Sequence, residues 1–118
     1  MKRFASHFVF YHRMLRLHYV ELSSGSNILN GVFPLEEEIA GTEFYDGILL
    51  PLPADFDISE INNILLKMKE EKKNPDWESF SSLLSSYLDL QLPLEGKPIR
   101  LLLLDIHKCT SAELGANH

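Results

Sequence analysis

The chain lacks what several classes of protein need. Its 118 residues include one cysteine, Cys109, so no intrachain disulfide can form, which suits a reducing, cytoplasmic location. No apolar run approaches the ~20 residues of a membrane span. Histidine and arginine interrupt the apolar N-terminus, so no signal peptide is expected. Eleven Lys and Arg against 17 Asp and Glu leave a net charge of −6, which argues against nucleic-acid binding.

What is present is the composition of one globular domain. Hydrophobic residues make up 45% and charged residues 24% of the chain, both ordinary values. A chain of this size buries roughly two-thirds of the surface that its unfolded form exposes. We therefore expect residues 1–118 to form a single domain.

Residues 4–52 are expected to form β-hairpins. Runs rich in aromatic and β-branched residues alternate with turn signals, the clearest being "SSGSN" at 23–27. Pro51 and Pro53 should end the last strand, because proline cannot donate to a sheet ladder. The expected strands are "FASHFVFY", "RLHYVEL", "ILNGVFPL" and "EFYDGILLPL", with a bend at "HRM" and a surface connector at "EEEIAGT".

Residues 57–90 predict a helical hairpin. Asp57 and Glu60 have the spacing of a capping box, and Asn74 with Pro75 should open the second helix. Apolar residues then recur at helical spacing on one face of each helix. They are Ile58, Ile61, Ile64, Leu65 and Met68 in the first helix, and Trp77, Phe80, Leu83, Leu84, Tyr87 and Leu88 in the second.

Residues 98–107 predict a returning strand. "IRLLLLDI" is apolar on both faces, as in strands near the middle of a sheet or beneath a helix. The final "HKCTSAELGANH" should tail off in polar turns. The fold class is therefore α+β: a mostly antiparallel, curved or sandwich-like β unit built from both chain ends, with a two-helix insertion packed on it.

Three segments together resemble a known superfamily. They are "ILNGVFPLEEE", "GTEFYDGILLP" with its Gly47 and Pro51, and "EGKPIRLLLLDIHKCTSAEL". In order and spacing they are similar to the amidohydrolase superfamily, in its cytosine-deaminase and chlorohydrolase-like branch. The resemblance implies a small β domain made from both chain ends, which in that family wraps a large metal-binding barrel.

The resemblance does not extend to the catalytic part of that family. Counting from Pro51, the family's two metal-binding histidines correspond to Asp57 and Ser59, and serine is a poor metal ligand. Only 61 residues follow Asp57, whereas an eight-stranded barrel takes about 250. The resemblance thus implies a barrel-less relative without a cofactor, which is not an enzyme and acts by protein contact or self-association, for example as a homodimer.

An alternative function is small-molecule binding. The family's active site would open near the end of the fourth strand. A ligand pocket is therefore expected between the helices and the sheet, near Pro51, Asp55 and Asp57.

A third reading is a small metal-dependent hydrolase. His7 and His18 could meet across the first hairpin, and His107 and Cys109 could share a strand face. A closed zinc site needs four ligands, usually in tight Cys and His pairs. The favoured interpretation is that the histidines form ordinary hydrogen bonds and that Cys109 is half-buried.

Two apolar surfaces are candidate interfaces. The N-terminal strand, with Phe4, Phe8 and Phe10, could pair edge to edge in a dimer. The stripe of the second helix, with Trp77, Phe80 and Tyr87, could remain partly uncovered and serve a partner.

Overall fold

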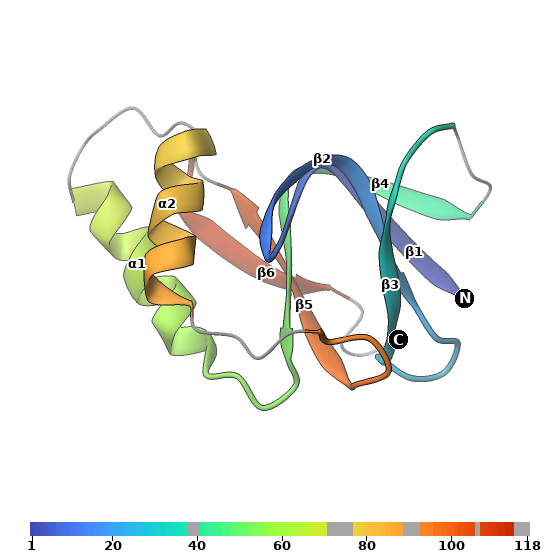
Figure 1. The fold of residues 1–118 in the computed structure, drawn as a ribbon. Coiled ribbons are helices and arrows are strands. Elements are labelled where there is room, and N and C mark those ends of the chain that lie inside the picture. The colour runs from blue at the N-terminus through green and yellow to red at the C-terminus, as the bar shows by residue number, and fades with distance from the viewer. Residues whose placement is uncertain (38–40, 71–76, 89–92, 106, 115–118) are drawn as a thin grey trace.

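The computed structural model describes residues 1–37, 41–70, 77–88, 93–105 and 107–114. These residues form six strands and two helices, with both helices inserted between the fourth and fifth strands (Figure 1). The elements are β1 (Lys2–Tyr11), β2 (Arg13–Leu22), β3 (Leu29–Pro34), β4 (Thr42–Pro53), α1 (Ile58–Glu70), α2 (Trp77–Tyr87), β5 (Ile99–Asp105) and β6 (Thr110–Leu114).

All six strands belong to one sheet, in the order β3-β2-β1-β4-β5-β6. Neighbouring strands run antiparallel, except for the parallel pair β1 and β4. Because β5 lies beside β4, segments from both ends of the chain build one sheet. The predicted α+β class, with a two-helix insertion on a mostly antiparallel sheet, is confirmed.

Two expectations about the strands are wrong. β1 is an interior strand with β2 on one side and β4 on the other, so its backbone has no open edge for a second molecule. The tail expected to consist of polar turns contains β6, which pairs with β5 from Leu101 opposite Leu114 to Asp105 opposite Thr110. An outer strand needs only one neighbour and can keep exposed polar side chains, so periodicity did not reveal it.

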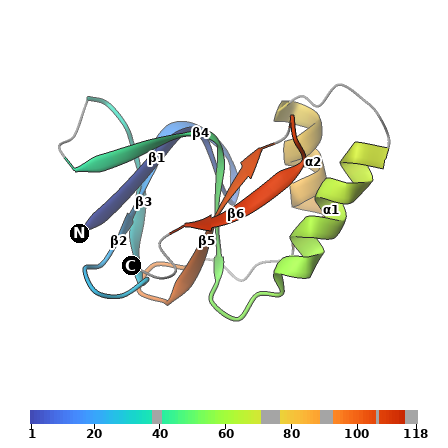
Figure 2. The same ribbon diagram turned by 180° about the vertical axis from the view of Figure 1, so that it is seen from behind.

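A glycine bends the sheet in the middle of β4. The pairing of β1 with β4 shifts between Ser6 and Phe8, and Gly47 lies at this irregularity with φ +143°. A Cβ on Gly47 would lie 2.5 Å from the carbonyl oxygen of Leu104 in β5. Only glycine allows this close approach of two backbones. Figure 2 shows that β4 changes direction along its length.

The buried apolar residues form two clusters along the bent sheet. One cluster packs α1 and α2 against β4 and β5 and includes Phe80, Leu84, Leu50 and Leu102. The other contains residues from both faces: Phe4 and Val20 lie on the same face as the first cluster, whereas Leu49 and Leu101 lie on the opposite face. Alternate residues of β4 and β5 therefore face different clusters, which explains why both strands are apolar on both faces.

The helices form as the periodicity predicted. Asp57 caps α1, since its Oδ1 accepts a hydrogen bond from the backbone N–H of Ser59 at 3.0 Å. In both helices the apolar stripe faces the sheet: Ile61, Ile64, Leu65, Phe80 and Leu84 are buried, and Ile58, Met68, Leu83 and Leu88 pack against the same cluster. The structure does not describe Asn74 and Pro75, nor the side chains of Trp77 and Tyr87.

Candidate functional site

A row of aromatic side chains crosses four adjacent strands on one face of the sheet. Register places Phe33 of β3 opposite Tyr19 of β2, Tyr19 opposite Ala5 of β1, and Ala5 opposite Phe44 of β4. Residues directly opposite one another point to the same side of a sheet. Phe44 is 51% exposed and Phe33 39% exposed. We call this surface, formed by Tyr19, Phe33 and Phe44 together with His7 and Leu17, the aromatic face.

The rings of the aromatic face form two pairs, one on each side of Ala5. Tyr19 and Phe33 lie with their centroids 5.5 Å apart. His7 and Phe44 meet edge to face at 5.1 Å. Such pairs hold their rings in place, and Ala5 beneath them is fully buried.

The ring of Phe33 is further constrained by a glycine on its own strand. A Cβ on Gly31 would lie 2.5 Å from Cζ of Phe33, so the ring lies directly above Gly31. Leu17, two residues before Tyr19 in β2, is 46% exposed and has a left-handed backbone with φ 53°. The aromatic face is thus made of side chains held by the sheet rather than of loop residues.

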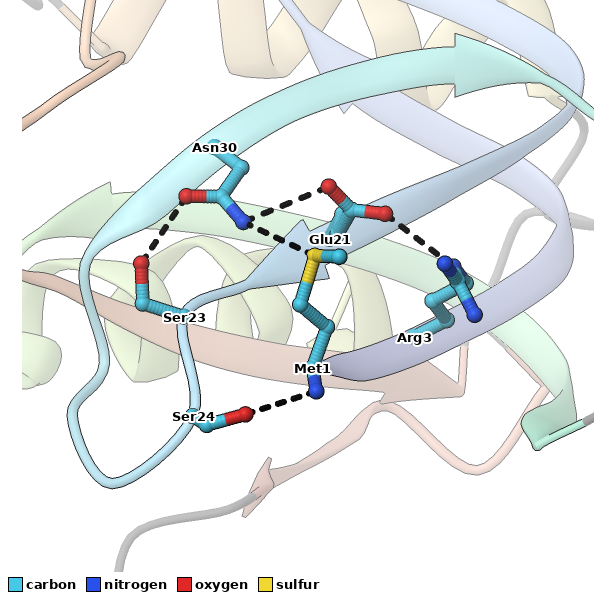
Figure 3. Close-up of polar contacts among 6 residues, drawn as sticks. All are labelled: Met1, Arg3, Glu21, Ser23, Ser24 and Asn30. Carbon is cyan, nitrogen blue, oxygen red and sulfur yellow. Dashed lines mark hydrogen bonds and ion pairs between the residues drawn. The ribbon is translucent and has the colours of Figure 1, made fainter.

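A polar network closes one end of the aromatic face. Arg3 and Glu21 are opposite each other one row further along the same face, and Arg3 Nε donates to Glu21 Oε1 at 3.0 Å. Asn30 Nδ2 donates to the other carboxylate oxygen at 3.2 Å, and Ser23 Oγ donates to Asn30 Oδ1 at 2.9 Å (Figure 3). The charges of Arg3 and Glu21 are therefore matched, and the Met1 ammonium, which donates to Ser24 Oγ at 2.6 Å, adds a positive charge to the network (Figure 3).

A hollow of about 550 Å³ lies between α2 and the tip of the β1–β2 hairpin. Phe8 and Met14 are its half-buried apolar part, and Arg16 and Glu78 bring one charge of each sign. Ser81 and Ser82 complete the lining. Its volume suits a small ligand.

A second hollow, of about 360 Å³, is more polar. It lies beside the start of β1, and Glu43, Tyr45 and Glu113 are among its lining residues. The hydroxyl of Tyr45 donates to Glu43 at 2.5 Å. This hydrogen bond, with burial second, raises the pKa of Tyr45 to about 12, because ionised Tyr45 would lose the bond and face a carboxylate.

The structure places the predicted ligand-binding residues apart from both of these hollows. Pro51 is buried in β4 opposite Leu101, and Asp55 is exposed in the turn that follows. Asp57 caps α1, and its pKa is lowered first by the hydrogen bond from the Ser59 side chain and then by that from the Ser59 backbone. Its carboxylate is therefore engaged in capping the start of α1.

The weak metal candidates are not brought together. His18 lies opposite Ser6, so the next residue of β1, His7, points to the other face, where it contacts Phe44. His107 and Cys109 lie in the turn between β5 and β6, not on a shared strand face. Within the described ranges no three His, Cys, Asp or Glu side chains are grouped as metal ligands.

The predicted interface residues divide between core and surface. Phe4, Phe10 and Phe80 are at most 5% exposed, so the expectation that they offer an interface is corrected: they are core residues. Phe8 is half-buried and lines the hollow beside α2. Trp77 and Tyr87 belong to α2, but their side chains are outside the description.

Sequence reasoning missed the aromatic face. The signal was present: Phe33 and Phe44 are large apolar residues in strands whose alternate neighbours, Val32 and Tyr45, pack on the core. Apolar residues at successive positions of a strand mean that both faces are apolar. Whether the second face is covered depends on where the helices pack, and they pack on the face of Ile48, Leu50 and Leu52, opposite to that of Phe44.

Comparison with known proteins gives no match. No family model, no curated protein and no solved structure matches the chain. Among the described helices none is long and apolar enough to cross a membrane.

Proposed function

We propose that this protein is a non-catalytic domain that acts by contact with protein, and that the aromatic face is its contact surface. One observation supports the proposal: Leu17, Phe33 and Phe44, from three of the four consecutive strands β3-β2-β1-β4, are exposed on one face. Aromatic residues are enriched at protein interfaces, and contiguous exposed apolar patches mark interaction sites.

The expected strength follows from the exposed area. A phenylalanine buries roughly 150–250 Å² when fully enclosed, so a half-exposed ring offers about 100 Å². Covering it stabilises a complex by about 2–3 kcal/mol. Three such residues give about 6–8 kcal/mol, against an association cost of 4–15 kcal/mol. The contact should therefore be weak and reversible.

In-cell photo-cross-linking tests the proposal. A photoreactive phenylalanine analogue is placed at Phe44, and as a matched control at Leu66 of α1, which is 54% exposed but away from the aromatic face. We expect a discrete protein adduct from position 44 and none from position 66. No adduct from either position, or equal adducts from both, would refute the proposal.

We further propose that the chain is a relative of the amidohydrolase β domain. Support comes from the three segments that resemble that family and from Asp57 and Ser59 at its metal-ligand positions. A sheet built from both chain ends is compatible with it. Stoichiometric zinc, iron or manganese in the purified protein, or turnover of cyclic amides or amidines, would contradict the non-catalytic reading.

A second candidate function is the binding of a small molecule in the hollow between α2 and the β1–β2 hairpin. Its favouring observation is the combination of apolar Phe8 and Met14 with Arg16 and Glu78 in one concave surface, the usual make-up of a ligand site. In an NMR fragment screen, fragments that bind in this hollow should then shift the resonances of Met14 and Ser82. Shifts confined to other residues would count against this function.

A further inference from the structure

We infer that the occupant of the aromatic face is a second copy of this chain, packed sheet against sheet around a twofold axis. This inference rests on the proposed function and adds the identity of the partner. Three properties of the described residues carry it: charge, shape and the state of the sheet edges.

The charge balance of the aromatic face suits self-association. The chain carries a net charge of −6, so two copies repel each other unless their contact surfaces are locally neutral. On this face Arg3 and Glu21 neutralise each other, and their side chains are only 25% and 15% exposed. Asp46, two residues after Phe44 in β4, and the Met1 ammonium beside the polar network add one charge of each sign. An anionic partner would compete with Glu21 for Arg3, and a cationic partner would compete with Arg3 and Asn30 for Glu21.

The shape of the face suits another sheet. Four strands at about 4.8 Å spacing give a surface some 15–20 Å wide, and two sheets can pack face to face with nearly aligned strands. No large side chain separates the two ring pairs, because Ala5 lies between them. A face built in this way can meet its own copy with the same residues on both sides, as a twofold interface requires.

The sheet edges are poorly suited to the other common mode, edge-to-edge pairing. The outer side of β3 is engaged at Leu29 by Gly96 and Lys97, and the strand ends at Pro34, which limits extension. At the other edge, the side chain of Ser111 in β6 donates to the side chain of Asn62 in α1, so α1 lies beside part of this strand. Contact through the face is therefore favoured over contact through an edge.

The area predicts the strength of the dimer. About 300 Å² of exposed Leu17, Phe33 and Phe44 on each copy gives about 600 Å² in all. Even with the flanking Tyr19 and His7 the total stays below the roughly 1,200 Å² of stable specific interfaces, in the range of weak and transient contacts. We therefore expect a monomer–dimer equilibrium in the high-micromolar range rather than an obligate dimer.

Sedimentation equilibrium of the purified chain tests the inference. From about 10 µM to about 1 mM, the average mass of the wild type should rise from 13.5 kDa towards twice that value. Phe44→Ser and Phe33→Ser should each weaken dimerisation about tenfold or more. Leu66→Ser, matched in exposure, should behave as the wild type, and circular dichroism checks that every variant is folded.

The outcomes separate the two proposals. A wild type that stays at 13.5 kDa at the highest concentration, or a Leu66→Ser variant as impaired as Phe44→Ser, overturns self-association. If the chain is monomeric but position 44 still cross-links to a different protein in cells, the proposed function stands and the second copy is the wrong occupant. If neither dimer nor adduct is found, both fail.

Discussion

Replacing Gly47 by alanine tests the physical account of the bent sheet. Two costs add. A φ of +143° is a conformation that L-residues rarely adopt, which costs about 1–3 kcal/mol. The new Cβ would also lie 2.5 Å from the Leu104 carbonyl oxygen and 3.1 Å from Cδ1 of Leu103. Because the oxygen belongs to a paired strand it cannot move cheaply, and such crowding costs about another 1–3 kcal/mol.

The expected loss for Gly47→Ala is therefore about 4 kcal/mol, a large part of the 5–15 kcal/mol that stabilises a typical domain. The midpoint of thermal unfolding should fall by roughly 10–20 °C. Urea titration followed by far-ultraviolet circular dichroism gives the free energy of unfolding directly.

Gly25 provides the matched control. It also has a positive φ, +75°, but a Cβ there would meet nothing within 4 Å. Gly25→Ala should therefore lower the free energy of unfolding only by the cost of the left-handed backbone conformation, about 1–2 kcal/mol. If the two variants are destabilised equally within about 0.5 kcal/mol, the contact between β4 and β5 at Gly47 is not what requires glycine, and the reasoning is refuted.

Three further predictions concern the core, a titration and a loop. Phe80→Ala removes a fully buried ring between α2 and the sheet and should cost about 3–5 kcal/mol by urea titration; a loss below 1 kcal/mol would show that α2 does not pack there. Tyr45 should ionise near pH 12, so its contribution to stability is complete below pH 10 and is lost as pH rises to 12; tyrosinate absorbance should show a lower pKa in Glu43→Gln, and an unchanged pKa would contradict the assigned cause. Tyr11→Phe removes the hydroxyl that accepts the N–H of Leu94 at 2.8 Å, which should cost about 1–2 kcal/mol and accelerate hydrogen exchange at Leu94; unchanged exchange would mean that the bond is not formed in solution.

Much of the local structure could be predicted because it depends on short-range physics. Asp57 at a helix start, the Ile61–Ile64–Leu65 stripe and the turn around Gly25 are each set by neighbouring residues. The apolar run of β5 likewise predicted a strand covered on both faces, and the two clusters on either side of it confirm that.

The candidate site could not be predicted in the same way. Phe4, Phe10 and Phe44 all read as apolar strand residues, yet the first two are in the core and the third is exposed. The difference arises from the face on which each side chain lies and from the face on which the helices pack. Phe44 lies on the face opposite to Phe4 and Phe10, and the helices pack on the face of Phe10. Neither is encoded in the pattern of a single strand.

The sequence by itself determined the fold class, the positions of the helices and most strands, and which side chains are apolar enough to need burial, because periodicity and capping act over a few residues. Only the tertiary structure decided that β1 lies inside the sheet, that β6 forms its edge and that Phe33 and Phe44 remain uncovered. Strand order and coverage depend on contacts between residues distant in the chain, for which local patterns carry no signal. The surface through which we propose this protein works is therefore a property of the assembled sheet rather than of any one segment.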